Sequence, residues 1–168
     1  MRKNTRYLVY CAMIAALYAV LTHLQNLLIP GSATWAIQFR ASEALCVLAF
    51  FTPAAIPGLT LGTLLFNITF AQALPLDFLL GSLASFLAAV SIYQCRNITL
   101  RGYPLPGMLM PALWNALIVG EELSIYIGGG FWFNAMTVAI GEIAVLLTLG
   151  TVLYYALRAR GLDKKLLS

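Results

Sequence analysis

Long apolar runs, separated by short polar segments, dominate the chain. The first run covers residues 8–29, is nearly free of charge and ends at Pro30-Gly31. It is long enough for a helix that crosses a bilayer, which needs roughly 20 residues. It is too long for a cleaved signal peptide, and no small-residue cleavage site precedes a polar mature domain. We therefore expect a retained membrane helix.

Five further apolar runs follow, and each is predicted to be a helix across the membrane. Thr52-Pro53 predicts the start of the third helix, since threonine is a favoured N-cap and proline suits the first helical position. Asp77 is placed to cap the fourth helix, and the glycines at 128–130 should stop the fifth. The predicted spans are residues 8–29, 41–51, 53–74, 77–94, 106–127 and 132–157.

The second of these runs is short, and extended chain could form its beginning. All the loops are short, which predicts one transmembrane domain over residues 1–168, an all-α bundle of six helices. Open strands are excluded because unpaired backbone groups are costly in lipid.

Composition supports a membrane protein. The 168 residues are 61% hydrophobic and 10% charged, with a mean hydropathy of +0.88, whereas soluble domains carry about 25% charged residues. The three cysteines are scattered and His23 is the single histidine. Neither a disulfide framework, a metal site nor a bound cofactor is expected.

The basic residues predict the orientation. Nine of the ten lie within residues 2–6, 96–101 and 158–165, which six spans would place on one side. Positive residues mark the cytoplasmic side, so both termini should be cytoplasmic. The exception is Arg40.

Polar side chains gather toward the opposite side. Charges at membrane depth cost about 2.5–3.5 kcal/mol each and usually mark a functional site. The helical spacing puts Asn115 and Glu122 on one face, and Asn134 and Glu142 roughly on another. We therefore predict an outward-opening pocket. Its candidate ligand-binding residues are Trp35, Gln38, Arg40, Glu43, Asn67, Asn115, Glu122, Asn134 and Glu142.

Each group of candidates also has a structural interpretation. The tryptophans could belong to an interfacial aromatic belt, and the asparagines could bond helix to helix. Arg40 and Glu43 could form a local ion pair that orders the loop. If they do form a pocket, carboxylates, amides and aromatic rings suit a flat, nitrogen-rich heterocycle, and the acidic excess favours an amine.

Small residues four positions apart form a second pattern. They occur as Ala12-Ala16 and Ala15-Ala19, and again as Gly58-Gly62. Such spacing lets helices approach closely, either inside this chain or against another one. The chain carries no phosphate-binding loop for a nucleotide, so it shows no motif of its own that could supply energy for transport.

Five ordered blocks of the sequence are distinctive: IQFRASEAL (37–45), PAAIPGLTLG (53–62), DFLLGSLAS (77–85), NALIVGEEL (115–123) and FWFNAMTVAIGE (131–142). Together they resemble the QueT family, the substrate-binding components of energy-coupling-factor transporters. The resemblance implies six helices in a prokaryotic plasma membrane. It also implies uptake of a queuosine precursor, either 7-aminomethyl- or 7-cyano-7-deazaguanine.

The same resemblance implies partners. These are one transmembrane subunit and two ATP-hydrolysing subunits, so this chain would itself be no enzyme, and no nucleic acid is expected. Docking on the transmembrane subunit would use the alanine pattern of the first helix: Ala12, Ala15, Ala16 and Ala19.

Three alternatives stay open. One is a substrate-binding component for another vitamin-like heterocycle. Another is an intramembrane enzyme, suggested by Glu121-Glu122, although the arginine and histidines that such an enzyme needs are missing. The third is a plain assembly protein that binds no ligand.

Overall fold

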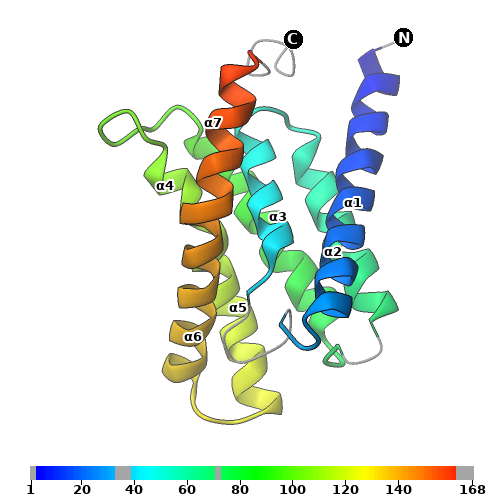
Figure 1. The fold of residues 1–168 in the computed structure, drawn as a ribbon. Helices are drawn as coiled ribbons and strands as arrows, with labels where there is room; N and C mark the ends of the chain where they lie inside the picture. The colour runs from blue at the N-terminus through cyan, green and yellow to red at the C-terminus, as the bar shows by residue number, and fades with distance from the viewer. Residues whose placement is uncertain (1–2, 33–38, 71–72, 162–168) are drawn as a thin grey trace.

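The computed structural model describes residues 3–32, 39–70 and 73–161, and every regular element in these ranges is helical, as predicted. The elements are α1 (Lys3–Leu28), η1 (Ala41–Phe50), α2 (Ala55–Thr69), α3 (Asp77–Cys95), α4 (Leu105–Met108), α5 (Met110–Tyr126), α6 (Phe131–Val145), η2 (Leu146–Gly150) and α7 (Thr151–Ala159). η1 is a 3₁₀-helix, and η2 is a π-helical stretch that joins α6 and α7. Figure 1 shows α6 and α7 as one long helix.

The helices form an up-and-down bundle. The start of α1 and the end of α7 lie at one end of the bundle, and the turn between α5 and α6 lies at the other (Figure 1). Four helices are long and apolar enough to cross a membrane: Asn4–Leu28, Asp77–Cys95, Leu105–Tyr126 and Phe131–Ala159. η1 and α2 are apolar but shorter, so the six-span topology and the orientation stay predictions.

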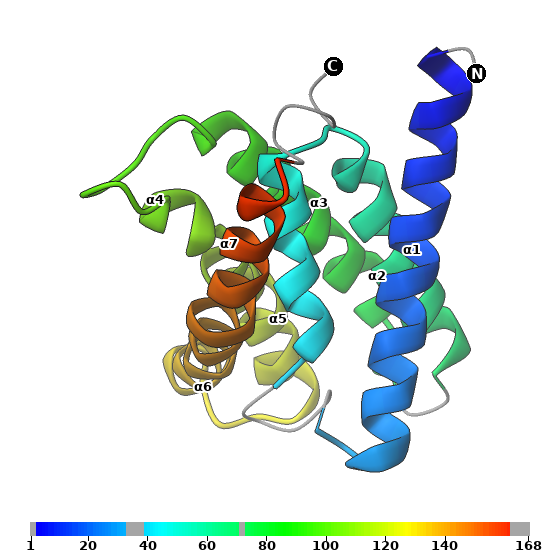
Figure 2. The ribbon, with the colours of Figure 1, turned by 45° about the horizontal axis from the view of Figure 1, so that its top comes forward.

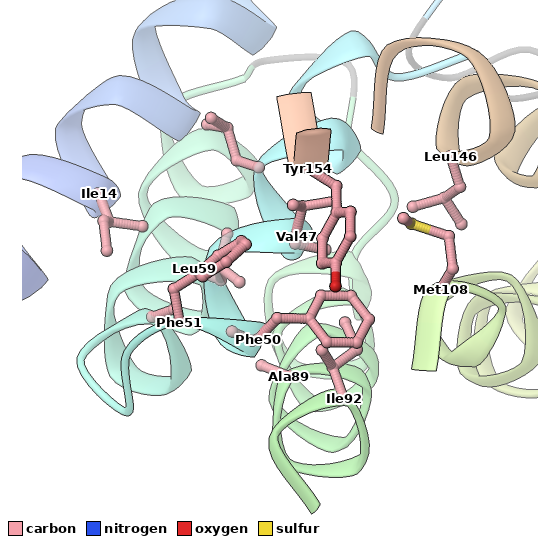
Figure 3. Close-up of a cluster of buried hydrophobic side chains, with 14 of the residues drawn as sticks. Ile14, Val47, Phe50, Phe51, Leu59, Ala89, Ile92, Met108, Leu146 and Tyr154 are labelled. Carbon is pink, nitrogen blue, oxygen red and sulfur yellow. The ribbon is translucent and has the colours of Figure 1, made fainter. Parts of the chain in front are cut away.

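η1 lies at the centre of the bundle (Figure 2) and contacts α1, α2, α3, α6, η2 and α7. Most of its side chains are buried. A 3₁₀-helix rises about 2.0 Å per residue, so it covers more depth than an α-helix of equal length. Its C-terminal half contributes to the main hydrophobic core, in which Phe50 and the following residue, Phe51, pack against Tyr154 of α7 (Figure 3).

α1 and α2 pack closely through glycines of α2. A Cβ on Gly58 would lie 2.9 Å from the Ile14 Cβ, and one on Gly62 would lie 2.7 Å from the Tyr18 Cβ and 3.0 Å from the Ala15 carbonyl oxygen. The predicted small-residue pattern at Gly58-Gly62 therefore serves packing inside this chain.

Two predicted helix caps are wrong. α2 begins at Ala55, not at Thr52-Pro53, because a short turn precedes it in which the Thr52 Oγ1 accepts a hydrogen bond from the Ala54 N–H. Asp77 is the first residue of α3 and makes no side-chain cap, because its carboxylate turns toward Arg40. The predicted stop at 128–130 is confirmed, since all three glycines have positive φ and α6 begins directly after them.

Substitution of Gly62 tests the α1–α2 contact. Gly62→Ala should destabilise the bundle by about 1–3 kcal/mol, the usual cost of overpacking, because Tyr18 or the α1 backbone must move. Gly150→Ala is the matched control, since its Cβ would meet nothing closer than 3.5 Å. Unfolding in mixed detergent micelles measures both, and equal stabilities would contradict this account of the packing.

Candidate functional site

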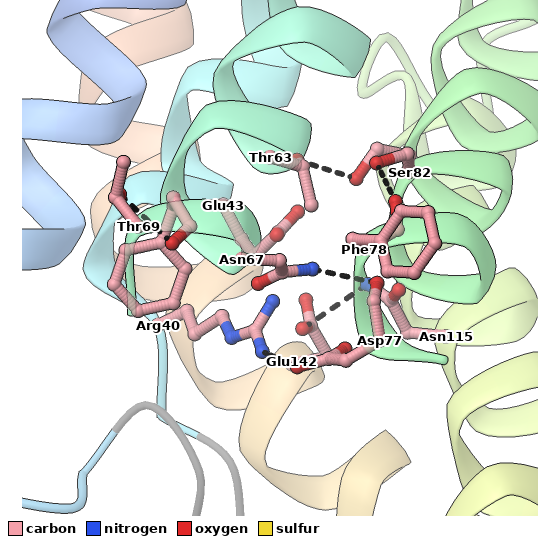
Figure 4. A network of polar contacts seen from close by, with 12 residues as sticks. Arg40, Glu43, Thr63, Asn67, Thr69, Asp77, Phe78, Ser82, Asn115 and Glu142 are labelled. Atoms are coloured by element: carbon pink, nitrogen blue, oxygen red, sulfur yellow. Dashed lines mark hydrogen bonds and ion pairs between the residues drawn. The ribbon is translucent and has the colours of Figure 1, made fainter. Parts of the chain in front are cut away.

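Seven buried polar side chains lie in the half of the bundle that is opposite the start of α1 and the end of α7, and Figure 4 labels all of them except Glu122. They come from the segment before η1, from η1 itself and from α2, α3, α5 and α6. We call them the polar cluster: Arg40, Glu43, Asn67, Asp77, Asn115, Glu122 and Glu142. The most exposed of them has a relative exposure of 6%.

Arg40 lies in the middle of this cluster. Its backbone is extended, with φ −97° and ψ 103°, so the residue precedes η1 and is not part of it. Its Nη2 lies 3.9 Å from the Asp77 Oδ2, and its guanidinium lies 5.7 Å from the centre of the Phe66 ring. Asn67 joins the two sides, because its Nδ2 donates to the Asp77 carbonyl oxygen at 2.7 Å. These two contacts of Asp77, with Arg40 and with Asn67, thus link the segment before η1 to α2 and α3.

Glu43 points from η1 toward α1. Its Oε1 accepts a hydrogen bond from the Tyr18 hydroxyl, and its Oε2 accepts one from the Cys46 thiol at 3.1 Å. One turn further along α1, Thr22 bonds to Ser42 at 2.7 Å. These contacts fix the first turn of η1 against α1.

α5 and α6 supply the remaining groups. Asn115 donates to the Glu142 Oε1 at 3.2 Å. Glu122 lies two turns after Asn115 on the buried face of α5, and its carboxylate interacts electrostatically with Asp77 and Arg40. Arg40 interacts in the same way with Glu43 and Glu142.

Hydrogen-bond acceptors in this cluster outnumber donors. Both oxygens of Glu122, the Glu142 Oε2 and the Asn67 Oδ1 are buried without a hydrogen-bond partner among the described residues. The cluster also holds four carboxylates and one guanidinium. Buried polar groups are normally satisfied, and each unsatisfied one costs about 1–3 kcal/mol. The arrangement is therefore suited to a guest that carries several N–H donors and a positive charge.

The structure brings together six of the nine predicted ligand-binding residues. Asn134 is also buried, but its Nδ2 donates to the Gly128 carbonyl oxygen at 2.7 Å and to the Ser124 Oγ at 3.2 Å, so it holds the turn before α6. Trp35 and Gln38 lie outside the described residues.

The alternative interpretation, a local ion pair between Arg40 and Glu43, is wrong. Arg40 forms an ion pair with Asp77, because Arg40 is extended while Glu43, inside η1, turns to Tyr18. Sequence reasoning also missed Tyr18 and Asp77 as members of the site. Two signals were present: Tyr18 and Thr22 are polar residues four apart in an apolar helix, and Asp77 is an acid at the start of another.

The four alanines of α1 fall on two different faces. Ala15 is buried against α2, whereas Ala12 and Ala16 are exposed and Ala19 is partly buried. A groove of about 490 Å³ runs along the exposed face, between Ala16 and neighbouring α1 side chains and Leu48 of η1. Ala12-Ala16 is therefore the small-residue pair that is open to another helix.

The described residues show no grouping of three or more His, Cys, Asp or Glu side chains that could hold a metal ion. Glu121 and Glu122, the pair that suggested an intramembrane enzyme, point apart: Glu121 is exposed and Glu122 is buried.

Comparison with known proteins identifies the family of this chain. A search of curated proteins found no match, and neither did a search of solved structures. A family model described as QueT transporter matches residues 8–159, which is most of the chain. The chain therefore belongs to the QueT transporter family.

Proposed function

We propose that this chain is the substrate-binding subunit of an energy-coupling-factor importer, and that it takes up a queuosine precursor. The observation that carries the proposal is the polar cluster: buried, rich in acceptors and negatively charged, inside a bundle of the QueT transporter family. A 7-deazaguanine offers the matching edge, since its ring N–H and amino group are adjacent donors that one carboxylate can accept.

The unsatisfied acceptors favour the aminomethyl form over the cyano form. An aminomethyl group is protonated at neutral pH and brings three donors and a positive charge. A nitrile brings only another acceptor to a site where Glu122, Glu142 and Asn67 already present four unpaired oxygens. Charge-assisted hydrogen bonds are about twice as strong as neutral ones, so the amine should bind more tightly.

The mechanism follows from where the cluster lies. If the arginine-rich end faces the cytoplasm, the cluster lies in the half of the bundle that faces the outside. Trp35 and Gln38 belong to the segment of sequence between α1 and Arg40. Ligand binding would neutralise the cluster. The bundle would then dock through Ala12-Ala16 on a transmembrane subunit, and two partner ATPases would supply the energy. Six membrane crossings, with η1 and α2 as the short ones, and a cell-membrane location are part of this proposal.

Adjacent glutamates provide a test of the ligand site. Glu122→Gln should weaken binding of 7-aminomethyl-7-deazaguanine about 10- to 100-fold, since a hydrogen bond to a charged group contributes about 1.5–3 kcal/mol. Glu121→Gln should leave binding unchanged, because Glu121 is exposed. Isothermal titration calorimetry of the purified protein measures both variants, with guanine as the ligand control. Equal affinities of the two variants, or binding of guanine as tight as that of the amine, would contradict the proposed site.

A bulky residue at Ala16 separates docking from binding. Ala16→Trp should abolish uptake by cells while the purified variant binds ligand normally, because Ala16 is exposed and lies outside the polar cluster. Met136→Trp, at a residue of α6 that is 63% exposed, is the control and should transport normally. Normal uptake by Ala16→Trp would show that this face is not the docking surface.

A further inference from the structure

A pocket with a volume of about 260 Å³ lies at the end of the bundle opposite the polar cluster. Its floor is aromatic and consists of Phe50, Phe51 and Tyr154, all buried. Its rim carries Arg96, which follows α3, and Arg158 in the last turn of α7. We call it the arginine pocket, and it shares no residue with the polar cluster.

The two arginines are held at the rim by partners that leave donors available. The Arg96 Nη1 donates to the Tyr93 carbonyl oxygen at 2.8 Å, and its guanidinium lies 4.0 Å from the centre of the Tyr93 ring. The Arg158 Nη1 lies 3.5 Å from the Tyr154 hydroxyl. A guanidinium has five N–H donors in a planar fork that suits a phosphate, so these contacts use only a fraction of them.

No acidic side chain among the described residues balances this charge locally. The five acids in the described ranges all belong to the segments that form the opposite half, at Glu43, Asp77, Glu121, Glu122 and Glu142. Arg6 near the start of α1 and Arg160 directly after α7 add positive charge at the end of the bundle where these helix ends lie (Figure 1), and Arg101 adds more in the loop that follows Arg96. An anion is therefore the complementary guest.

The loop beside the pocket indicates where that anion comes from. Asn97 and Thr99 line the pocket, whereas Ile98 and Leu100, which alternate with them, are 54% and 57% exposed. Val152 on the neighbouring α7 is 70% exposed. Apolar side chains displayed around a polar pocket suit the boundary between acyl chains and headgroups better than they suit water.

We propose that the arginine pocket binds the phosphate of an anionic phospholipid, with the acyl chains lying against the exposed apolar residues of the loop and α7. Basic pockets between membrane helices on the cytoplasmic side are a known way of binding such headgroups. A bound lipid would tie the end of η1 to α3 and α7, at the edge of the hydrophobic core.

The test uses the full chain in detergent and native mass spectrometry with phosphatidylglycerol or phosphatidylcholine. Phosphatidylglycerol should bind more tightly. An exposed ion pair contributes up to about 1 kcal/mol, or about fivefold in affinity, so the double variant Arg96→Gln/Arg158→Gln should lose about 25-fold. The double variant Arg101→Gln/Arg160→Gln removes the same charge outside the pocket and should stay within about twofold of the parent, because a single lipid in detergent presents no extended charged surface.

Three outcomes would overturn the proposal: equal losses in the two double variants, equal binding of the two lipids, or displacement of phosphatidylglycerol by excess inorganic phosphate. The last would assign the pocket to a soluble anion. If the pocket double variant does not fold, Asn97→Leu replaces it, since Asn97 lines the pocket and is an exposed residue that lies outside the helices. It should lower phosphatidylglycerol binding without changing helical content.

Discussion

The structure depends on keeping charge inside an apolar bundle. Arg40 is the one cation of the polar cluster, and its pairing with Asp77 joins the start of η1 to α3. Burying either charge alone would be strongly unfavourable, and breaking such a pair typically costs 3–5 kcal/mol. Glu43 completes the attachment by bonding to Tyr18 of α1. These contacts hold the start of η1 against α1 and α3. The carboxylates that these contacts leave unsatisfied, on Glu122 and Glu142, are the groups that a ligand can use.

The central helix η1 contributes both to the polar cluster and to the hydrophobic core. η1 is central and almost wholly buried, so its first turn presents Glu43 to one half of the bundle while Phe50 and Phe51 fill the core of the other half. The close contact of α1 with α2 at Gly58 and Gly62 allows both helices to reach η1. The hydrophobic core and the polar cluster therefore occupy different levels of the same bundle, and one short helix contributes to both.

Much of this was accessible from the sequence, and the exceptions have physical reasons. Apolar run length indicates helices in lipid because the bilayer fixes the length that is needed, and rare charges in such runs indicate a buried site, so most of the polar cluster could be named. The pairing of these charges could not be predicted. Asp77, which forms an ion pair with Arg40, is 37 positions away in the sequence, whereas spacing suggests only the local alternative, Glu43. The 3₁₀ form of η1 could not be predicted either, because ten mostly apolar residues predict a helix without its pitch. Likewise, spacing alone could not tell that Ala15 faces α2 while Ala16 faces outward.

The two ends of the molecule carry opposite chemistry: acceptors around one arginine at one end, and arginines without local acids among the described residues at the other. The first end governs the account, because a buried excess of carboxylate needs a cationic, donor-rich guest. The most direct measurement is the mass spectrum of small molecules released from gently purified protein, before and after incubation with 7-aminomethyl-7-deazaguanine. The account predicts that this amine is retained and is displaced poorly by its cyano analogue. A folded protein that stays empty in excess amine, or that retains a ligand without a basic group, would contradict it.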